Sequence, residues 1–158
     1  MQLNEILTQD RIFILSEKFE KKEEVIRLLF ERSLDSSFNK KSRDTIFETL
    51  MEREQSMSTG IGLGVAIPHC STELVTEVFA VIGVLKNGID FQSVDDIPVR
   101  IVALLILPKN KFEKHIKTLA SLARFFNEEH LRKKILDSKT PEEIFQIVIE
   151  ESANIKEN

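Results

Sequence analysis

Apolar side chains recur every three or four positions in three stretches of the chain, which is the spacing of an amphipathic helix. These stretches are residues 22–34, 42–55 and 112–126. Two further helices are expected at 128–136 and from Pro141 onward. Ser42 is the expected N-cap of the second helix. Thr140 is that of the last helix, where Pro141 suits the first turn and Glu143 completes a capping box.

Three other apolar runs lack helical spacing and predict β-strands at 11–15, 77–85 and 99–107. The last two are apolar almost throughout, as in strands that are covered on both faces. The dipeptide at 87–88, Asn-Gly, predicts a tight turn between them. Because strands and helices alternate, we expect an α/β fold with helices on both faces of the sheet. Residues from about 153 to 158 are expected to fray.

Composition narrows the kind of protein. A chain of 158 residues with 42% hydrophobic content fits one domain over residues 1–158. With 22 basic and 26 acidic residues the net charge is −4, which argues against nucleic-acid binding. The single cysteine excludes an internal disulfide, and the N-terminus lacks the pattern of an export signal, so we expect a cytoplasmic protein. The apolar run 101–107 is too short to cross a bilayer, and no direct membrane insertion is expected.

A glycine-containing segment, STGIGLG at residues 58–64, precedes the short apolar run 65–68 and His69. Its glycines permit positive φ angles and a close approach of main-chain N–H groups to an anion. His69, next to this flexible backbone, is the first candidate for a reactive side chain. The segment is GxGxG and continues as a strand, so it differs from a dinucleotide fingerprint, and the chain contains no P-loop motif. A phosphoryl group would therefore come from a donor other than a bound nucleotide.

Three further residues are weaker candidates by themselves. His115 lies in the first turn of the helix 112–126, where N–H groups favour an anion, although a satisfied core histidine is the commoner case. Arg53 is close in sequence to the glycine segment, although it could equally belong to a surface cluster of charges. Cys70 follows His69, but the spacing of cysteine and histidine matches no metal site, so no metal is expected.

Residues 53–69 read REQSMSTGIGLGVAIPH, which resembles the signature of the type-2 IIA domains of the phosphotransferase system. This family includes the fructose, mannitol and nitrogen-regulatory IIA proteins. The resemblance continues through 88–91, 96–108 and 115–124 and so covers nearly the whole chain. It implies a mixed, mostly parallel β-sheet flanked by helices on both faces. Cys70 departs from the pattern, since many relatives have glycine or alanine there.

The resemblance also implies roles for the candidates. His69 matches the histidine that is phosphorylated, on Nε2, His115 matches the second active-site histidine, and Arg53 matches the arginine beside the phosphate. The remaining phosphate-binding donors are expected from Ser58, Thr59 and Gly60.

The expected activity is that of a phosphocarrier, a phosphotransferase component with a phosphohistidine intermediate. It would accept a phosphoryl group from the carrier protein HPr on His69 and pass it to a IIB component. No cofactor is implied. The alternative is a regulatory protein of the nitrogen-regulatory type, whose phosphorylation state controls which partners bind without any sugar transport.

Overall fold

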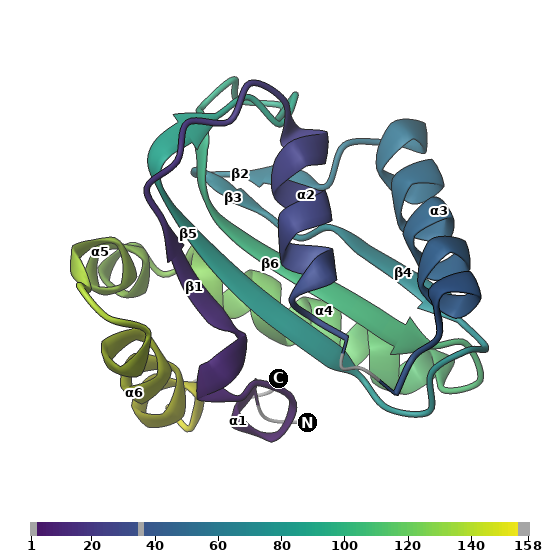
Figure 1. The fold of residues 1–158 in the computed structure, drawn as a ribbon. Coiled ribbons are helices and arrows are strands. Elements are labelled where there is room, and N and C mark those ends of the chain that lie inside the picture. The colour runs from purple at the N-terminus through teal and green to yellow at the C-terminus, as the bar shows by residue number, and fades with distance from the viewer. Residues whose placement is uncertain (1–2, 35–36, 155–158) are drawn as a thin grey trace.

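A computed structural model describes residues 3–34 and 37–154 of the chain. A six-stranded mixed sheet forms its centre (Figure 1). Its strands are β1 (Ile12–Leu15), β2 (Gly60–Gly62), β3 (Val65–Ala66), β4 (His69–Thr72), β5 (Phe79–Ile89) and β6 (Val99–Pro108). The spatial order is β1-β5-β6-β3-β2, and β4 also pairs with β6, beyond the end of β3. The pairs β1·β5, β3·β6 and β4·β6 are parallel, whereas β5·β6 and β2·β3 are antiparallel.

Helices cover both faces of the sheet (Figure 1). The helices are α1 (Leu3–Ile6), α2 (Lys22–Glu31), α3 (Lys40–Ser56), α4 (Phe112–Asn127), α5 (Glu129–Asp137) and α6 (Pro141–Ser152), with a short 3-10 helix η1 (Gln9–Arg11). One apolar core lies under α2 and α3, and a second lies under α1, α4, α5 and α6. The mixed α/β fold with helices on both faces, which the sequence predicts, is confirmed.

The position of β6 between two cores explains why its sequence is apolar at every position except Arg100. From Ile101 to Leu107 its side chains alternate, and the odd-numbered ones, such as Ile101 and Leu105, belong to the core under α4. The even-numbered ones, such as Val102 and Leu104, belong to the core under α2 and α3. Because successive side chains of a strand point to opposite faces, a strand between two cores needs apolar residues at every position.

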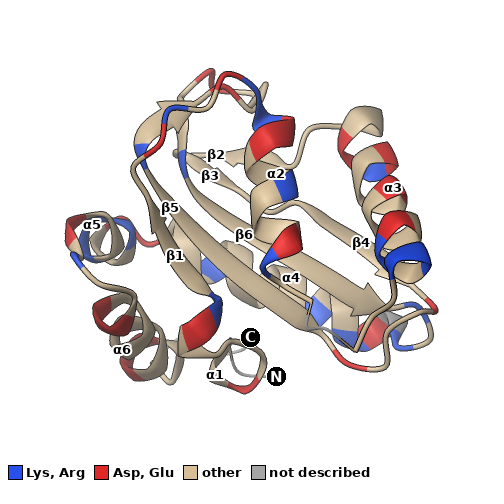
Figure 2. Ribbon diagram, in the orientation of Figure 1, with Lys and Arg blue, Asp and Glu red and all other residues tan. Residues whose placement is uncertain are grey.

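Charged side chains lie on the helices and the connecting segments, and the sheet carries few of them (Figure 2). Both signs occur along α3, as they do along α2. Within residues 3–34 and 37–154, no helix combines the length and the apolar character that a membrane span requires.

The N-cap of the second predicted helix lies three residues earlier than expected. Ser42 is not the N-cap, because α3 begins at Lys40 and the Asn39 side chain caps it by accepting a hydrogen bond from the Ser42 N–H at 2.8 Å. Asparagine and serine are both good caps, so the local pattern could not distinguish the two positions. At the last helix the predicted N-cap is confirmed, since Thr140 accepts a hydrogen bond from the Glu143 N–H at 3.2 Å. The Glu143 side chain, predicted to complete a capping box with Thr140, accepts instead from the Lys139 N–H at 2.9 Å.

The tight turn predicted at Asn87-Gly88 is wrong. Both residues lie inside β5, where the register with β6 shifts between Val84 and Ile89. A methyl group on Gly88 would lie 2.7 Å from Cβ of Pro98. Glycine is therefore required here because Pro98 packs closely against the backbone of β5. The actual connection between β5 and β6 runs through residues 90–98.

Two further observations concern the ends of the chain. Helix α1 has four residues, too few for the periodic pattern that predicts a helix. Of the tail expected to fray, 153–154 form a turn after α6, and 155–158 lie outside the described residues.

Candidate active site

His69 is the first residue of β4, and the register of that strand decides where its side chain points. His69 pairs with Leu105 of the parallel neighbour β6, and Leu105 belongs to the core under α4. The His69 side chain, which is half-buried, therefore points to the face that α4 covers.

Cys70, the next residue, points the opposite way. It belongs to the core under α2 and α3, and its Sγ lies 4.0 Å from the Ile46 carbonyl oxygen. Burial raises the pKa of the Cys70 thiol to about 12, so the thiol is protonated and uncharged. Although adjacent in sequence, Cys70 and His69 therefore lie in different environments.

One hydrogen bond defines the chemistry of the His69 ring. Nδ1 lies 2.8 Å from the carbonyl oxygen of Ile67. A carbonyl oxygen can only accept, so Nδ1 carries the proton and the neutral ring has its free lone pair on Nε2. This geometry leaves Nε2 as the ring nitrogen that could act as a nucleophile.

The pKa of His69 lies below its ordinary value of about 6.5. Burial is the largest cause, because it disfavours the charged ring. The hydrogen bond to Ile67 raises the pKa, the Arg53 charge lowers it, and the Glu54 charge raises it by the smallest amount. His69 is therefore neutral at neutral pH, which is the form that can attack an electrophile.

Arg53 lies in the last turn of α3, close enough for its charge to act on His69. Its Nη1 donates to the carbonyl oxygen of Met57, the C-cap residue of the same helix, at 2.8 Å. Within the described parts of the chain, no ion pair joins it to an acidic neighbour, and Glu54 is buried. The surface-cluster interpretation of Arg53 is therefore not supported.

The segment that contains Ser58, Thr59 and Gly60 runs beside β3 and the residues that follow it, since Gly60 pairs with Ala66 and the Ile67 N–H donates to the Thr59 carbonyl oxygen at 3.0 Å. The Ser58 hydroxyl donates to the Phe91 carbonyl oxygen and accepts from the Gly60 N–H at 3.1 Å. These contacts fix the segment against the connection 90–98.

Glu54 of α3 binds the same segment through Thr59. Its side chain is buried, and Oε2 accepts from the Thr59 hydroxyl at 2.5 Å, while Oε1 accepts from the Thr59 N–H at 3.3 Å. Oε1 also forms an ion pair with Lys22 Nζ at 2.9 Å. The sequence analysis missed both Glu54 and Lys22. Glu54 forms a pair with Arg53 in the signature, but Lys22 lies 32 positions away and has no local signal.

Gly60 is a residue that the packing requires. A methyl group there would lie 2.1 Å from Oγ of Ser93 and 3.1 Å from its Cβ. Gly60→Ala should therefore lower the free energy of unfolding by about 1–3 kcal/mol, as overpacking does. Urea unfolding measures this, with Ser93→Gly as the matched control. The double variant Gly60→Ala/Ser93→Gly should recover most of the lost stability. If Gly60→Ala alone were as stable as the wild type, the close contact with Ser93 would be contradicted.

His115 lies in the first turn of α4, on the sheet face to which His69 points, and is only 4% exposed. Its Nε2 is buried and has no hydrogen-bond partner among the described residues. A core histidine is normally satisfied, so an unpaired Nε2 at a helix N-terminus favours a role in binding. Burial, and secondarily the Lys111 charge, lower the pKa of His115 and favour the neutral ring.

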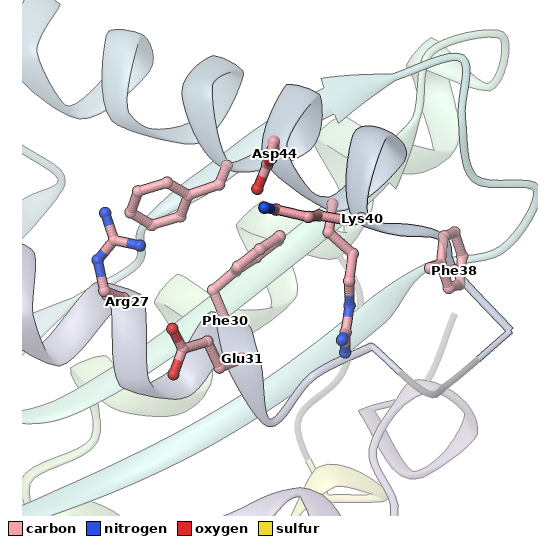
Figure 3. A pocket seen from close by; sticks show the side chains of 8 residues that line it. Arg27, Phe30, Glu31, Phe38, Lys40 and Asp44 are labelled. Atoms are coloured by element: carbon pink, nitrogen blue, oxygen red, sulfur yellow. The ribbon is translucent and has the colours of Figure 1, made fainter.

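A separate hollow of about 480 Å³ lies between α2 and the N-terminal half of α3 (Figure 3). Arg27, Lys40 and Arg43 line it together with Glu31 and Asp44, and the Arg27 guanidinium stacks on Phe47 at 4.3 Å. Charges of both signs surround this hollow, so it offers an anion no clear attraction. None of the candidate phosphate ligands lines it.

A neutral imidazole with a free Nε2, beside a guanidinium and a glycine segment, is suited to phosphoryl chemistry, and on this fold it defines a phosphotransferase component. The profile of the family "Phosphoenolpyruvate-dependent sugar phosphotransferase system, EIIA 2" matches residues 5–151, and the chain belongs to this family.

Known relatives come from two branches of that family. The fructose-specific EIIA component of Haloferax volcanii is 28% identical over 144 residues, which cover 91% of this chain and 93% of the relative. The nitrogen regulatory protein of Bradyrhizobium diazoefficiens is 35% identical over 103 residues, which cover 65% of this chain and 67% of the relative. The crystal structure of IIA-Ntr from Neisseria meningitidis superposes with a TM-score of 0.83 at 28% identity, and the superposition covers 92% of this chain and 98% of the other.

Proposed function

We propose that this chain is a phosphocarrier that accepts a phosphoryl group on Nε2 of His69 from phosphorylated HPr or an HPr-like protein and passes it to a IIB component. The observation that carries the proposal is the hydrogen bond between Nδ1 of His69 and the Ile67 carbonyl oxygen, which leaves Nε2 as the free nucleophile. Membership of the EIIA 2 family supports the same assignment.

In the transfer step, the Nε2 lone pair attacks phosphorus in line with the donor's phosphohistidine bond. The new P–N bond forms as the donor's P–N bond breaks, and the donor imidazole leaves with the bonding electron pair. The reaction needs no nucleotide or metal, because the phosphoryl group arrives already activated. Catalysis then consists of positioning and of neutralising charge on the three equatorial oxygens.

Arg53 and His115 are the proposed ligands of those oxygens. Arg53 is near enough to His69 for its charge to be felt, and its guanidinium can make two parallel hydrogen bonds to a phosphoryl group. His115 offers a buried Nε2 without a partner. The Ser58 hydroxyl already donates to Phe91, the Thr59 hydroxyl donates to Glu54, and the Gly60 N–H donates to the Ser58 hydroxyl, so we assign these groups mainly to holding the shape of the segment.

The test uses the intact protein with phosphoenolpyruvate, enzyme I and HPr, followed by mass spectrometry. We expect the mass to increase by one phosphoryl group that is lost in acid, and NMR of the phosphorylated ring should place it on Nε2. A chain that stays unmodified, or that carries an acid-stable phosphate, would contradict the proposal.

A regulatory protein of the nitrogen-regulatory type is the second candidate, favoured by the 35% identity to the Bradyrhizobium nitrogen regulatory protein. Both candidates share the chemistry at His69 and differ in the acceptor. Addition of the IIB components from the same organism to the phosphorylated protein distinguishes them. Rapid loss of the phosphoryl group to one IIB protein favours transport, whereas a persistent phosphohistidine with all of them favours regulation.

A further inference from the structure

Lys22 is a buried cation that the roles proposed above do not use. It is the first residue of α2 and only 7% exposed. Its Nζ lies 2.9 Å from Oε1 of Glu54 and 5.7 Å from the centre of the Phe91 ring. Removing an ammonium group from water is costly unless a partner compensates, so this placement indicates that Glu54 requires the charge.

Glu54 presents a problem for the proposed reaction. Its carboxylate accepts from the Thr59 hydroxyl, the Thr59 carbonyl oxygen accepts from the Ile67 N–H, and the Ile67 carbonyl oxygen accepts from Nδ1 of His69. The Glu54 charge also raises the pKa of His69, so the carboxylate acts on the ring electrostatically. A phosphoryl group on His69 would add a charge of about −1.5 to −2 to this group of contacts. Repulsion between this charge and the buried carboxylate disfavours the phosphorylated form, because charges are screened less where water is excluded.

We propose that Lys22 compensates the charge of Glu54 so that His69 can hold the phosphoryl group, while the Glu54 carboxylate positions Thr59. This inference rests on the proposed function of His69. Lys22 acts through Glu54 and is therefore a positioning residue. Of the cations in the described part of the chain, it alone forms an ion pair with Glu54, and Arg53 is left to face the phosphoryl group.

The first variant is Lys22→Met, which keeps a long apolar side chain and removes the charge. Its matched control is Lys21→Met, since Lys21 is exposed and adjacent. Two quantities are measured: the pKa of His69 by NMR titration of the unphosphorylated protein, and the equilibrium constant for phosphoryl exchange with HPr. In Lys22→Met we expect a higher His69 pKa and an equilibrium constant about tenfold lower. The control should leave both unchanged.

Glu54→Gln is the second variant and should act in the opposite direction. It leaves Lys22 without its counter-charge, so the His69 pKa should fall and the exchange equilibrium should shift toward the phosphorylated form. The glutamine amide oxygen can still accept from Thr59, which preserves the contact. The double variant Lys22→Met/Glu54→Gln restores neutrality and should return both quantities close to the wild-type values.

A role in folding alone would lower the thermal stability of these variants without moving the two quantities. The inference is overturned if both single variants retain the wild-type His69 pKa and exchange equilibrium, or if both shift in the same direction. Should Lys22→Met fail to fold, Glu54→Gln and the double variant test the same claim. The NMR titration needs no phosphorylation, so failure of the proposed function, seen as an unlabelled wild type, is distinguishable from failure of this inference.

Discussion

Replacement of His69 by alanine should abolish phosphorylation by HPr, because the variant lacks Nε2 of this ring, which we propose as the nucleophile. We expect a loss greater than about 10⁴-fold, as is typical when a nucleophile is removed. Intact-mass analysis after incubation with phosphoenolpyruvate, enzyme I and HPr measures it. His130→Ala is the control, since His130 is exposed and its Nδ1 lies 3.7 Å from Oε2 of Glu128, a surface contact. This variant should be labelled like the wild type.

The same assignment fixes the pH dependence of labelling. Burial, as the largest effect, lowers the pKa of His69 below about 6.5. Below this pKa the ring is an imidazolium ion without a lone pair to attack phosphorus. The rate should therefore rise with pH through the His69 pKa and be constant by about neutral pH. Labelling of His69→Ala, or a rate that falls as the pH rises to neutrality, would exclude this nucleophile.

Much of the fold was accessible from the sequence because its strongest patterns are local. The runs at 77–85 and 99–107 are apolar almost throughout because β5 and β6 lie between two cores, and burial on both faces favours apolar residues at successive positions. Helix starts were less well determined, as the shift of the N-cap from Ser42 to Asn39 shows. A cap depends on one side chain, and two suitable side chains stood three positions apart.

The missed features depend on contacts between distant residues. The Asn87-Gly88 pair has the composition of a turn, but the glycine is needed because Pro98 passes close to it. Lys22 and Glu54 are 32 positions apart, and neither a charge pattern nor a spacing links them before the chain is folded. The direction of His69 likewise depends on the register between β4 and β6, which no local pattern determines.

The candidate site was predictable to the extent that it follows one segment of chain. His69 and the segment 58–64 are adjacent in sequence, so their association needed no tertiary information. The preferred tautomer of His69 did need it, because it follows from the turn of chain that brings the Ile67 carbonyl oxygen to Nδ1. His115 was ambiguous for the same reason, since only the folded chain shows that its Nε2 is buried without a partner.

The second large effect is expected at His115, and it has opposite consequences for activity and stability. In the unphosphorylated protein the buried Nε2 is unpaired, which costs about 1–3 kcal/mol. His115→Leu removes this cost and keeps most of the packing, so the free energy of unfolding should rise by about 1 kcal/mol. Phosphoryl transfer from HPr should slow by about 10²–10³-fold, because a donor to the phosphoryl oxygens is lost.

His115→Gln provides the matched comparison, because its amide nitrogen can reach roughly the position of Nε2 and donate there. We expect it to transfer faster than His115→Leu and to be less stable. Urea unfolding and rapid-quench labelling at one pH measure both properties on the same samples. If His115→Leu were less stable than the wild type yet transferred at the wild-type rate, His115 would be a core residue. A stabilised but slow variant would instead indicate that the fold keeps an unsatisfied imidazole for the phosphoryl group.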